Sequence, residues 1–235
     1  YPEHWDKSEW ERDIKNIADI GFEFIHIAEF AWVELEPEEG VYTFEWLDEV
    51  VRLAGKYRLK VIMGTPTAIT PVWMGIRYPE TYLMNSNYLR AEHGTRAQSS
   101  LSNPIYRSYS EKIIRKLGER YGNNPTVTGW QLDNEPEAKE DYSPGSQQAF
   151  RSWLEKKYQS IDALNMAWGA AFWSQTYSDF DQIKIPNANL VGWWGTNPHA
   201  LLDFKRYASD TQADFLDFQV SILRPLISKN QFITT

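Results

Sequence analysis

The sequence predicts an α/β fold with a parallel sheet, and more narrowly a part of a (β/α)8 barrel. Short runs rich in β-branched and aromatic residues alternate with longer segments whose apolar residues recur at helical spacing. Strands joined by single helical crossovers lie parallel and connect right-handedly. No glycine-rich phosphate loop follows any predicted strand, which argues against the usual nucleotide chemistry of the competing architecture, a doubly wound sheet.

The first quarter of the chain gives the order helix, strand, helix, strand. Ser8 and Glu11 have the spacing of a capping box, which predicts that a helix begins there. Phe22 to Ala28 predicts the first strand. Glu45 to Tyr57 predicts a second helix with apolar residues on one face, and Leu59 to Gly64 predicts the next strand.

The remaining elements repeat this order with longer intervals. A helix near Tyr106 to Tyr121 precedes a strand at Thr126 to Leu132, which is rich in β-branched and aromatic residues. Later helices are predicted near Ser146 to Tyr158 and Leu201 to Ser228. The final segment, Phe232 to Thr235, has the pattern of a strand that is cut off as it begins.

The number of strands bears on how much of a barrel is present. A complete (β/α)8 barrel takes about 250 residues, whereas only four strands are predicted in these 235 residues. We therefore expect residues 1–235 to be part of a single barrel catalytic domain, with about strands 2 to 5 and their helices. The first strand is expected before Tyr1 and the last three after Thr235. The extra length follows the second and third predicted strands, where insertions would wall a substrate cleft.

The composition excludes several classes of partner. The formal net charge is −8 and basic residues are interspersed with acidic ones, so we expect no nucleic-acid surface. No apolar run approaches the roughly 20 residues that span a bilayer, so no membrane span is expected. The absence of cysteine excludes disulfides and thiolate metal sites, and it leaves the compartment of this soluble chain, cytoplasmic or periplasmic, undecided.

The most informative segment is Asp133-Asn134-Glu135-Pro136, which follows a buried strand directly. A carboxyl at the C-terminal end of a barrel strand lies where such folds keep their chemistry. Breaking a bond between sugars needs a carboxylic acid that protonates the leaving oxygen, and a neighbouring amide can hold a substrate hydroxyl. The alternative is that Glu135 caps the next helix or is solvated in a loop.

Other polar residues follow the other predicted strands. Glu29 follows the first strand, Thr65 the second, and Asn134 and Glu135 the third, and in a barrel these ends share one rim. With these strand ends, the chain resembles the glycoside hydrolase family 42 β-galactosidases through essentially all of its 235 residues. The resemblance also includes the segments Tyr1 to Trp5, Leu35 to Gly40, Phe172 to Gln175 and Tyr177 to Asp179.

The resemblance implies a retaining β-galactosidase on a (β/α)8 barrel, with Glu135 as the acid/base and Asn134 as a galactose-binding amide. Arg96 matches a sugar-binding arginine of the family, since it precedes a polar stretch and an Asn-Pro helix start; the alternative is a surface arginine. Trp173 matches a tryptophan that closes over a sugar, in a neighbouring subunit's site if the chain forms the trimers common in the family. Its alternative is a buried loop anchor. Glu29 is assigned a supporting hydrogen-bond role, with a salt bridge or structural network as the alternative.

Three departures from the family pattern affect the prediction. The family's nucleophile, a second Glu on a later strand, has no match here and is expected beyond Thr235. Many members hold zinc with four cysteines, but Ser100 stands where the first would be and residues 142–146 contain none, so no metal is expected. His26 stands where members commonly have Arg, and its default interpretation is a core histidine.

The expected substrate is a β-galactoside or galacto-oligosaccharide, cleaved by double displacement without any cofactor. Another barrel glycosidase with the same Asn-Glu-Pro signature, a β-mannanase or a β-glucosidase, is the alternative within the same chemistry. A non-catalytic sugar-binding barrel is the alternative of a different class. It predicts that the residue aligned with the nucleophile is not carboxylic.

Overall fold

The computed structural model describes all 235 residues, which form a four-stranded parallel sheet, a set of helices packed on it and a helical extension. The strands lie in the order β1-β2-β3-β4, and each neighbouring pair is parallel, as predicted. Each strand is short and near its predicted position. Their bounds are Phe24–Ile27 for β1, Lys60–Gly64 for β2, Val127–Gln131 for β3 and Phe232–Thr234 for β4.

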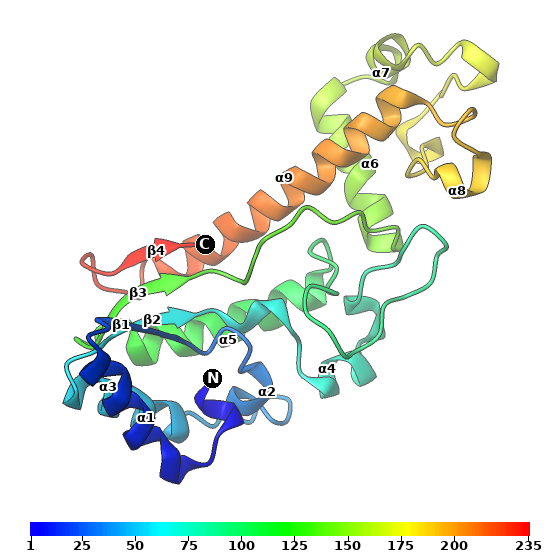
Figure 1. Cartoon of the computed structure of the whole chain (residues 1–235). Helices are drawn as coiled ribbons and strands as arrows, with labels where there is room; N and C mark the ends of the chain where they lie inside the picture. The colour runs from blue at the N-terminus through cyan, green and yellow to red at the C-terminus, as the bar shows by residue number, and fades with distance from the viewer.

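Four helices accompany the sheet and contribute to one core (Figure 1). They are α1 (Lys7–Ile20), α3 (Glu45–Lys56), α5 (Pro104–Tyr121) and α9 (Pro198–Leu223), the last of which packs along α5. The other helices lie in the connections: α2 (Trp32–Leu35), α4 (Val72–Arg77), α6 (Pro144–Tyr158), α7 (Ile161–Trp168) and α8 (Ala188–Val191). None of the helices combines the length and apolar character needed to cross a membrane.

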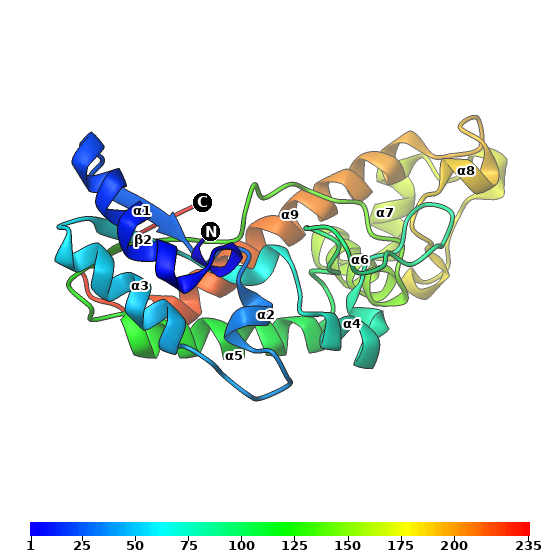
Figure 2. The ribbon, with the colours of Figure 1, turned by 60° about the horizontal axis from the view of Figure 1, so that its bottom comes forward.

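The molecule is elongated, and α9 spans most of its length (Figure 2). The sheet with α1, α3 and α5 lies at one end, while α6, α7, α8 and the beginning of α9 form the other, here called the distal module. Its separate aromatic core includes Phe150, Trp168 and Phe204. At its centre the buried carboxylate of Asp203 accepts hydrogen bonds from the Tyr158 hydroxyl and the Trp168 indole, at 2.6 and 3.0 Å.

The beginning of α1 differs from the prediction. Asp6 is the N-cap residue, and its Oδ1 accepts a hydrogen bond from the backbone N–H of Ser8 at 2.8 Å. The predicted Ser8–Glu11 capping box is therefore wrong, because Ser8 already lies in the first turn. A carboxylate at this position satisfies a free N–H and also favours the positive end of the helix dipole. The helix ends at Gly21, whose φ of 97° suits a residue without a side chain.

The helices α5 and α6 each begin at an Asn or Ser followed by proline. Asn103 caps α5 by accepting hydrogen bonds from the N–H groups of Ile105 and Tyr106, at 2.9 and 3.1 Å. Ser143 caps α6, which begins two residues before the predicted Ser146. The N–H at the first position of a helix has no acceptor within the helix. Proline, which lacks an N–H, therefore fits this position without losing a hydrogen bond, and both helices begin at a defined residue. This fixes the segments that lead out of the loops at the C-terminal edge of the sheet.

Candidate active site

The strand ends meet at the C-terminal edge of the sheet, as predicted, and hydrogen bonds join the ends of β2 and β3. The backbone N–H of Asp133 donates to Thr65 Oγ1 at 2.8 Å, and the Thr67 hydroxyl donates to Asp133 Oδ2 at 3.1 Å. Burial raises the pKa of the Asp133 carboxyl, and the bonds from the Asn134 N–H and the Thr67 hydroxyl offset part of this rise. Asp133 therefore supports the turn that carries Asn134 and Glu135.

The turn after β3 has an unusual backbone. Asp133 and Glu135 have φ angles of 57° and 47°, in the left-handed region that non-glycine residues seldom adopt. Each such residue costs on the order of 1–3 kcal/mol and persists only where the surroundings impose it, which is common at functional sites. The side chain of Glu135 is 73% exposed, and the next helix, α6, begins only at Pro144. Glu135 is thus not a helix cap.

The structure brings Arg96 and Glu135 together, although they are far apart in the sequence. Nη2 of Arg96 lies 2.6 Å from Oε2 of Glu135, and the arginine side chain is 46% exposed. The next residue, Ala97, has a φ of 58°, and its N–H donates to the carbonyl of Ala68 at 2.6 Å, which fixes the loop near the end of β2. Arg96 is therefore an exposed loop arginine, and its guanidinium pairs with Glu135.

Asn134 lies between the two strained residues. Its backbone N–H donates to Asp133 Oδ1 at 2.6 Å, whereas its side-chain Nδ2 is buried and has no hydrogen-bond partner. A buried donor without a partner costs free energy, and a ligand hydroxyl at this point would satisfy it. The predicted substrate-binding amide is thus free to donate.

Glu29 is buried just after the end of β1. Its side chain is 5% exposed and its Oε2 has no hydrogen-bond partner, while Nε2 of His26 lies 3.7 Å away. Gly64 on β2 approaches it so closely that an added Cβ would lie 2.6 Å from the Glu29 Cβ. His26 lies on the face of β1 opposite the buried Ile25 and Ile27, and its side chain is 34% exposed beside Glu29.

Tyr1 joins this group and was not singled out from the sequence as a site residue. The negative charge of Glu29 raises the pKa of the Tyr1 hydroxyl, and the nearby positive charge of Arg96 opposes this. Tyr1 therefore lies near both groups. The signal in the sequence is its place in the Tyr1 to Trp5 segment, where it could not be distinguished from a structural aromatic residue.

The structure does not bring Trp173 to this site. It lies in the distal module, is 65% exposed and stacks on Phe172 with ring centroids 4.6 Å apart. The alternative of a buried loop anchor is therefore wrong. The φ of Trp173 is 51°, so its backbone is also in the left-handed region.

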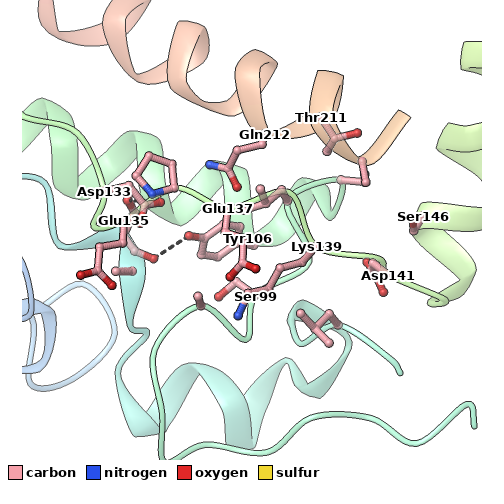
Figure 3. A pocket seen from close by; sticks show the side chains of 18 of the residues that line it. Ser99, Tyr106, Asp133, Glu135, Glu137, Lys139, Asp141, Ser146, Thr211 and Gln212 are labelled. Atoms are coloured by element: carbon pink, nitrogen blue, oxygen red, sulfur yellow. Dashed lines mark hydrogen bonds between the residues drawn. The ribbon is translucent and has the colours of Figure 1, made fainter. Parts of the chain in front are cut away.

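A pocket extends from Glu135 towards α9 (Figure 3). Figure 3 shows Glu135 and Glu137 on the segment after β3, Tyr106 at the start of α5, and Thr211 and Gln212 on α9. The Tyr106 hydroxyl donates to the carbonyl of Thr67 at 2.7 Å. The pocket is lined by polar and apolar side chains together, which suits a ligand that presents both hydroxyls and carbon faces.

The region where the family resemblance implies a zinc site in many members contains serines and one carboxylate. Ser100, Asp141 and Ser143 are hydrogen-bonded to one another, and no thiolate or imidazole is among them. No group of three or more His, Cys, Asp or Glu side chains is placed to hold a metal ion. This set of ligands does not fit a structural zinc, which takes four nitrogen or sulfur ligands.

A barrel-type sheet whose C-terminal edge presents an amide, a carboxyl and a guanidinium beside a pocket has the arrangement expected of the barrel glycoside hydrolases. The family model described as β-galactosidase, that of glycoside hydrolase family 42, matches residues 1–235, and the chain belongs to this family. The chain is 42% identical to a β-galactosidase of Thermus thermophilus over 227 residues, which are 95% of the chain and 35% of that relative.

Solved structures agree with this assignment. The chain superposes with a TM-score of 0.93 and 37% identity on the β-galactosidase of the psychrophilic Marinomonas ef1, over 99% of the chain and 35% of that protein. The Halorubrum lacusprofundi β-galactosidase gives a TM-score of 0.92 with 36% identity, over 99% and 35%. The predicted fold class is confirmed: the four strands are part of a (β/α)8 barrel. The chain spans about a third of the length of these relatives.

Proposed function

We propose that residues 1–235 supply the acid/base and much of the sugar-binding surface of a retaining β-galactosidase, as part of a single barrel catalytic domain. The observation that carries the proposal is the position of Glu135 just after a barrel strand, next to the unpartnered amide of Asn134 and within reach of Arg96. The names of the relatives, which are β-galactosidases, favour galactose over other sugars.

Glu135 would act in both steps of a double displacement. In the first step it donates its proton to the glycosidic oxygen while the bond from that oxygen to the anomeric carbon breaks. A second Glu, which the resemblance places outside these residues, forms the new bond to the anomeric carbon. In the second step Glu135 takes a proton from water, whose oxygen displaces the second Glu and restores the original configuration. The exposure of Glu135 to the pocket allows both the leaving group and water to reach it.

The neighbouring groups would orient the sugar. Arg96 offers fixed guanidinium donors to adjacent hydroxyls, and the unpartnered Nδ2 of Asn134 donates to another. The unpartnered Oε2 of Glu29 accepts a hydrogen bond behind them. Trp173 is too remote to serve this site within one chain, so its role requires a neighbouring subunit. A trimer, as the family resemblance implies, is the assembly we propose.

A panel of aryl glycosides tests the proposal in the full-length polypeptide that carries these residues. We expect turnover of the β-galactoside to exceed that of the β-glucoside and β-mannoside. NMR of the first-formed sugar should show the β anomer. A preference for mannoside or glucoside would favour another barrel glycosidase. Sugar binding with no turnover on any substrate would favour the non-catalytic alternative.

A further inference from the structure

Asp141 is a buried carboxylate that joins separate segments of the chain. It is 9% exposed. Its Oδ1 accepts hydrogen bonds from the backbone N–H groups of Met84 and Ser143, at 3.0 and 2.9 Å. Its Oδ2 accepts from the hydroxyls of Ser100 and Ser143, at 2.5 and 2.9 Å. All four donors therefore converge on one side chain, which accepts with both oxygens.

The joined segments are those that carry the two members of the ion pair at the candidate site. Ser100 is the fourth residue after Arg96, and Asp141 is the sixth after Glu135. Backbone bonds reinforce the junction, since Tyr142 N–H donates to the carbonyl of Met84 at 2.9 Å and Ser100 N–H to that of Thr81 at 2.7 Å. Asp141 thus lies where the loop with Arg96 meets the segment with Glu135.

The ion pair itself cannot hold these segments together. Both of its side chains are substantially exposed, and exposed pairs contribute only about 0–1 kcal/mol. A buried carboxylate with four donors is different, because the loss of its oxygens leaves several buried donors unpaired, at about 1–3 kcal/mol each. The placement of Arg96 beside Glu135 must therefore depend on buried contacts such as these.

We propose that Asp141 is a positioning residue that sets Arg96 at its distance from Glu135 through Ser100 and Ser143. The expected effect on catalysis rests on the proposed function. The expected effect on the position of Arg96 does not. The mechanism is geometric: a displacement of about 1 Å in a substrate-orienting group can cost about a hundredfold in rate. Asp141 itself does not touch the reacting atoms.

Asp141→Asn tests the structural part of the proposal in the full-length polypeptide. The amide keeps the shape of the side chain, but its NH2 group is a donor. It would face N–H and O–H groups that donate to the carboxylate in the unmodified protein. We expect hydrogen exchange at the Ala97 and Ser100 amides to become at least about tenfold faster. The matched control is Asp48→Asn, since Asp48 accepts from Arg120 and Tyr121, which do not line the pocket. It should leave those two amides unchanged. Unchanged exchange in Asp141→Asn would overturn the proposal.

A double-mutant cycle tests the catalytic part. Asp141→Asn alone should lower kcat/KM on an aryl β-galactoside by about ten- to a hundredfold, whereas Asp48→Asn should change it less than threefold. In an Arg96→Ala background, Asp141→Asn should add less than threefold, because its effect passes through Arg96. If the losses in kcat/KM from the two substitutions multiplied in full in the double variant, the proposal that Asp141 acts through Arg96 would be overturned. If the unmodified polypeptide had no galactosidase activity, the proposed function would fail, and the exchange experiment would still decide whether Asp141 holds the two segments.

Discussion

Replacing Arg96 with Ala separates the stability of the site from its chemistry. The change removes an ion pair whose two side chains are 46% and 73% exposed. Because solvent screens such a pair, its loss should lower the free energy of unfolding by no more than about 1 kcal/mol. The loop itself is held elsewhere, by the bond from the Ala97 N–H to Ala68 and by the Ser100 hydroxyl.

The effect on catalysis should be much larger. A guanidinium that binds two sugar hydroxyls makes two hydrogen bonds to a charged donor, each worth about 1.5–3 kcal/mol. Together they amount to about 3–6 kcal/mol, which corresponds to a loss of roughly 10²–10⁴ in kcat/KM at about 1.4 kcal/mol for each factor of ten. Arg96→Ala should therefore fold almost normally and hydrolyse galactosides very poorly.

The assay is kcat/KM on an aryl β-galactoside, measured together with the midpoint of thermal unfolding. Arg12→Ala is the matched control, since Arg12 is an exposed arginine on α1 that pairs with Glu9 and Asp13. It should show a comparably small change in stability and no change in activity. An Arg96→Ala enzyme that retains activity within threefold of the unmodified one would refute the assignment of Arg96 to sugar binding.

Further predictions concern packing, pH and the extent of the chain. Gly64→Ala should destabilise the fold by about 1–3 kcal/mol, because the new Cβ meets the Glu29 Cβ at 2.6 Å. The control is Gly145→Ala, because nothing lies within 4 Å of a Cβ added there. Equal unfolding midpoints for the two variants would contradict the predicted clash. Hydrogen bonds from Tyr109 and Arg77 lower the pKa of Glu39 from 4.5 to about 2. The resulting stabilisation is present above pH 4.5 and is lost as the pH falls towards 2, so Glu39→Gln should lower the unfolding midpoint at pH 7 but not near pH 2. A midpoint difference independent of pH would count against this. Finally, residues 1–235 alone should not hydrolyse an activated aryl β-galactoside. A retaining site needs two carboxyls about 5 to 5.5 Å apart, and the family pattern places only one of them here. Turnover like that of the full-length polypeptide would point to Glu29 as the nucleophile.

The sheet was predictable because its strands have a simple signature. β-branched and aromatic runs marked all four strands, and the helices between them required a parallel arrangement. The short helices α2, α4, α7 and α8 were not predicted, since one or two turns carry too few apolar residues to show a period. The start of α1 was misassigned because Asp6 and Ser8 are both good caps, and only the backbone geometry decides between them.

The candidate site was predictable only in part. The strand-end rule placed Glu29, Asn134 and Glu135 on one rim, but the contact of Arg96 with Glu135 depends on how a long loop folds back. Asp141 was missed, because its role arises from donors contributed by residues far away in the sequence. The one local signal was the Ser-Pro pair that follows it, which marks the beginning of α6.

The most direct test of the central claim is azide rescue of Glu135→Ala in the full-length polypeptide, with Glu137→Ala as the control from the same pocket. If Glu135 is the acid/base, its removal should lower cleavage of galactosides with poor leaving groups far more than cleavage of activated aryl galactosides, whose departure needs little protonation. Azide should then restore turnover and yield a β-galactosyl azide, while Glu137→Ala should give neither rescue by azide nor an azide product. Equal losses on both kinds of substrate, with no rescue by azide and no azide product, would contradict the assignment of Glu135.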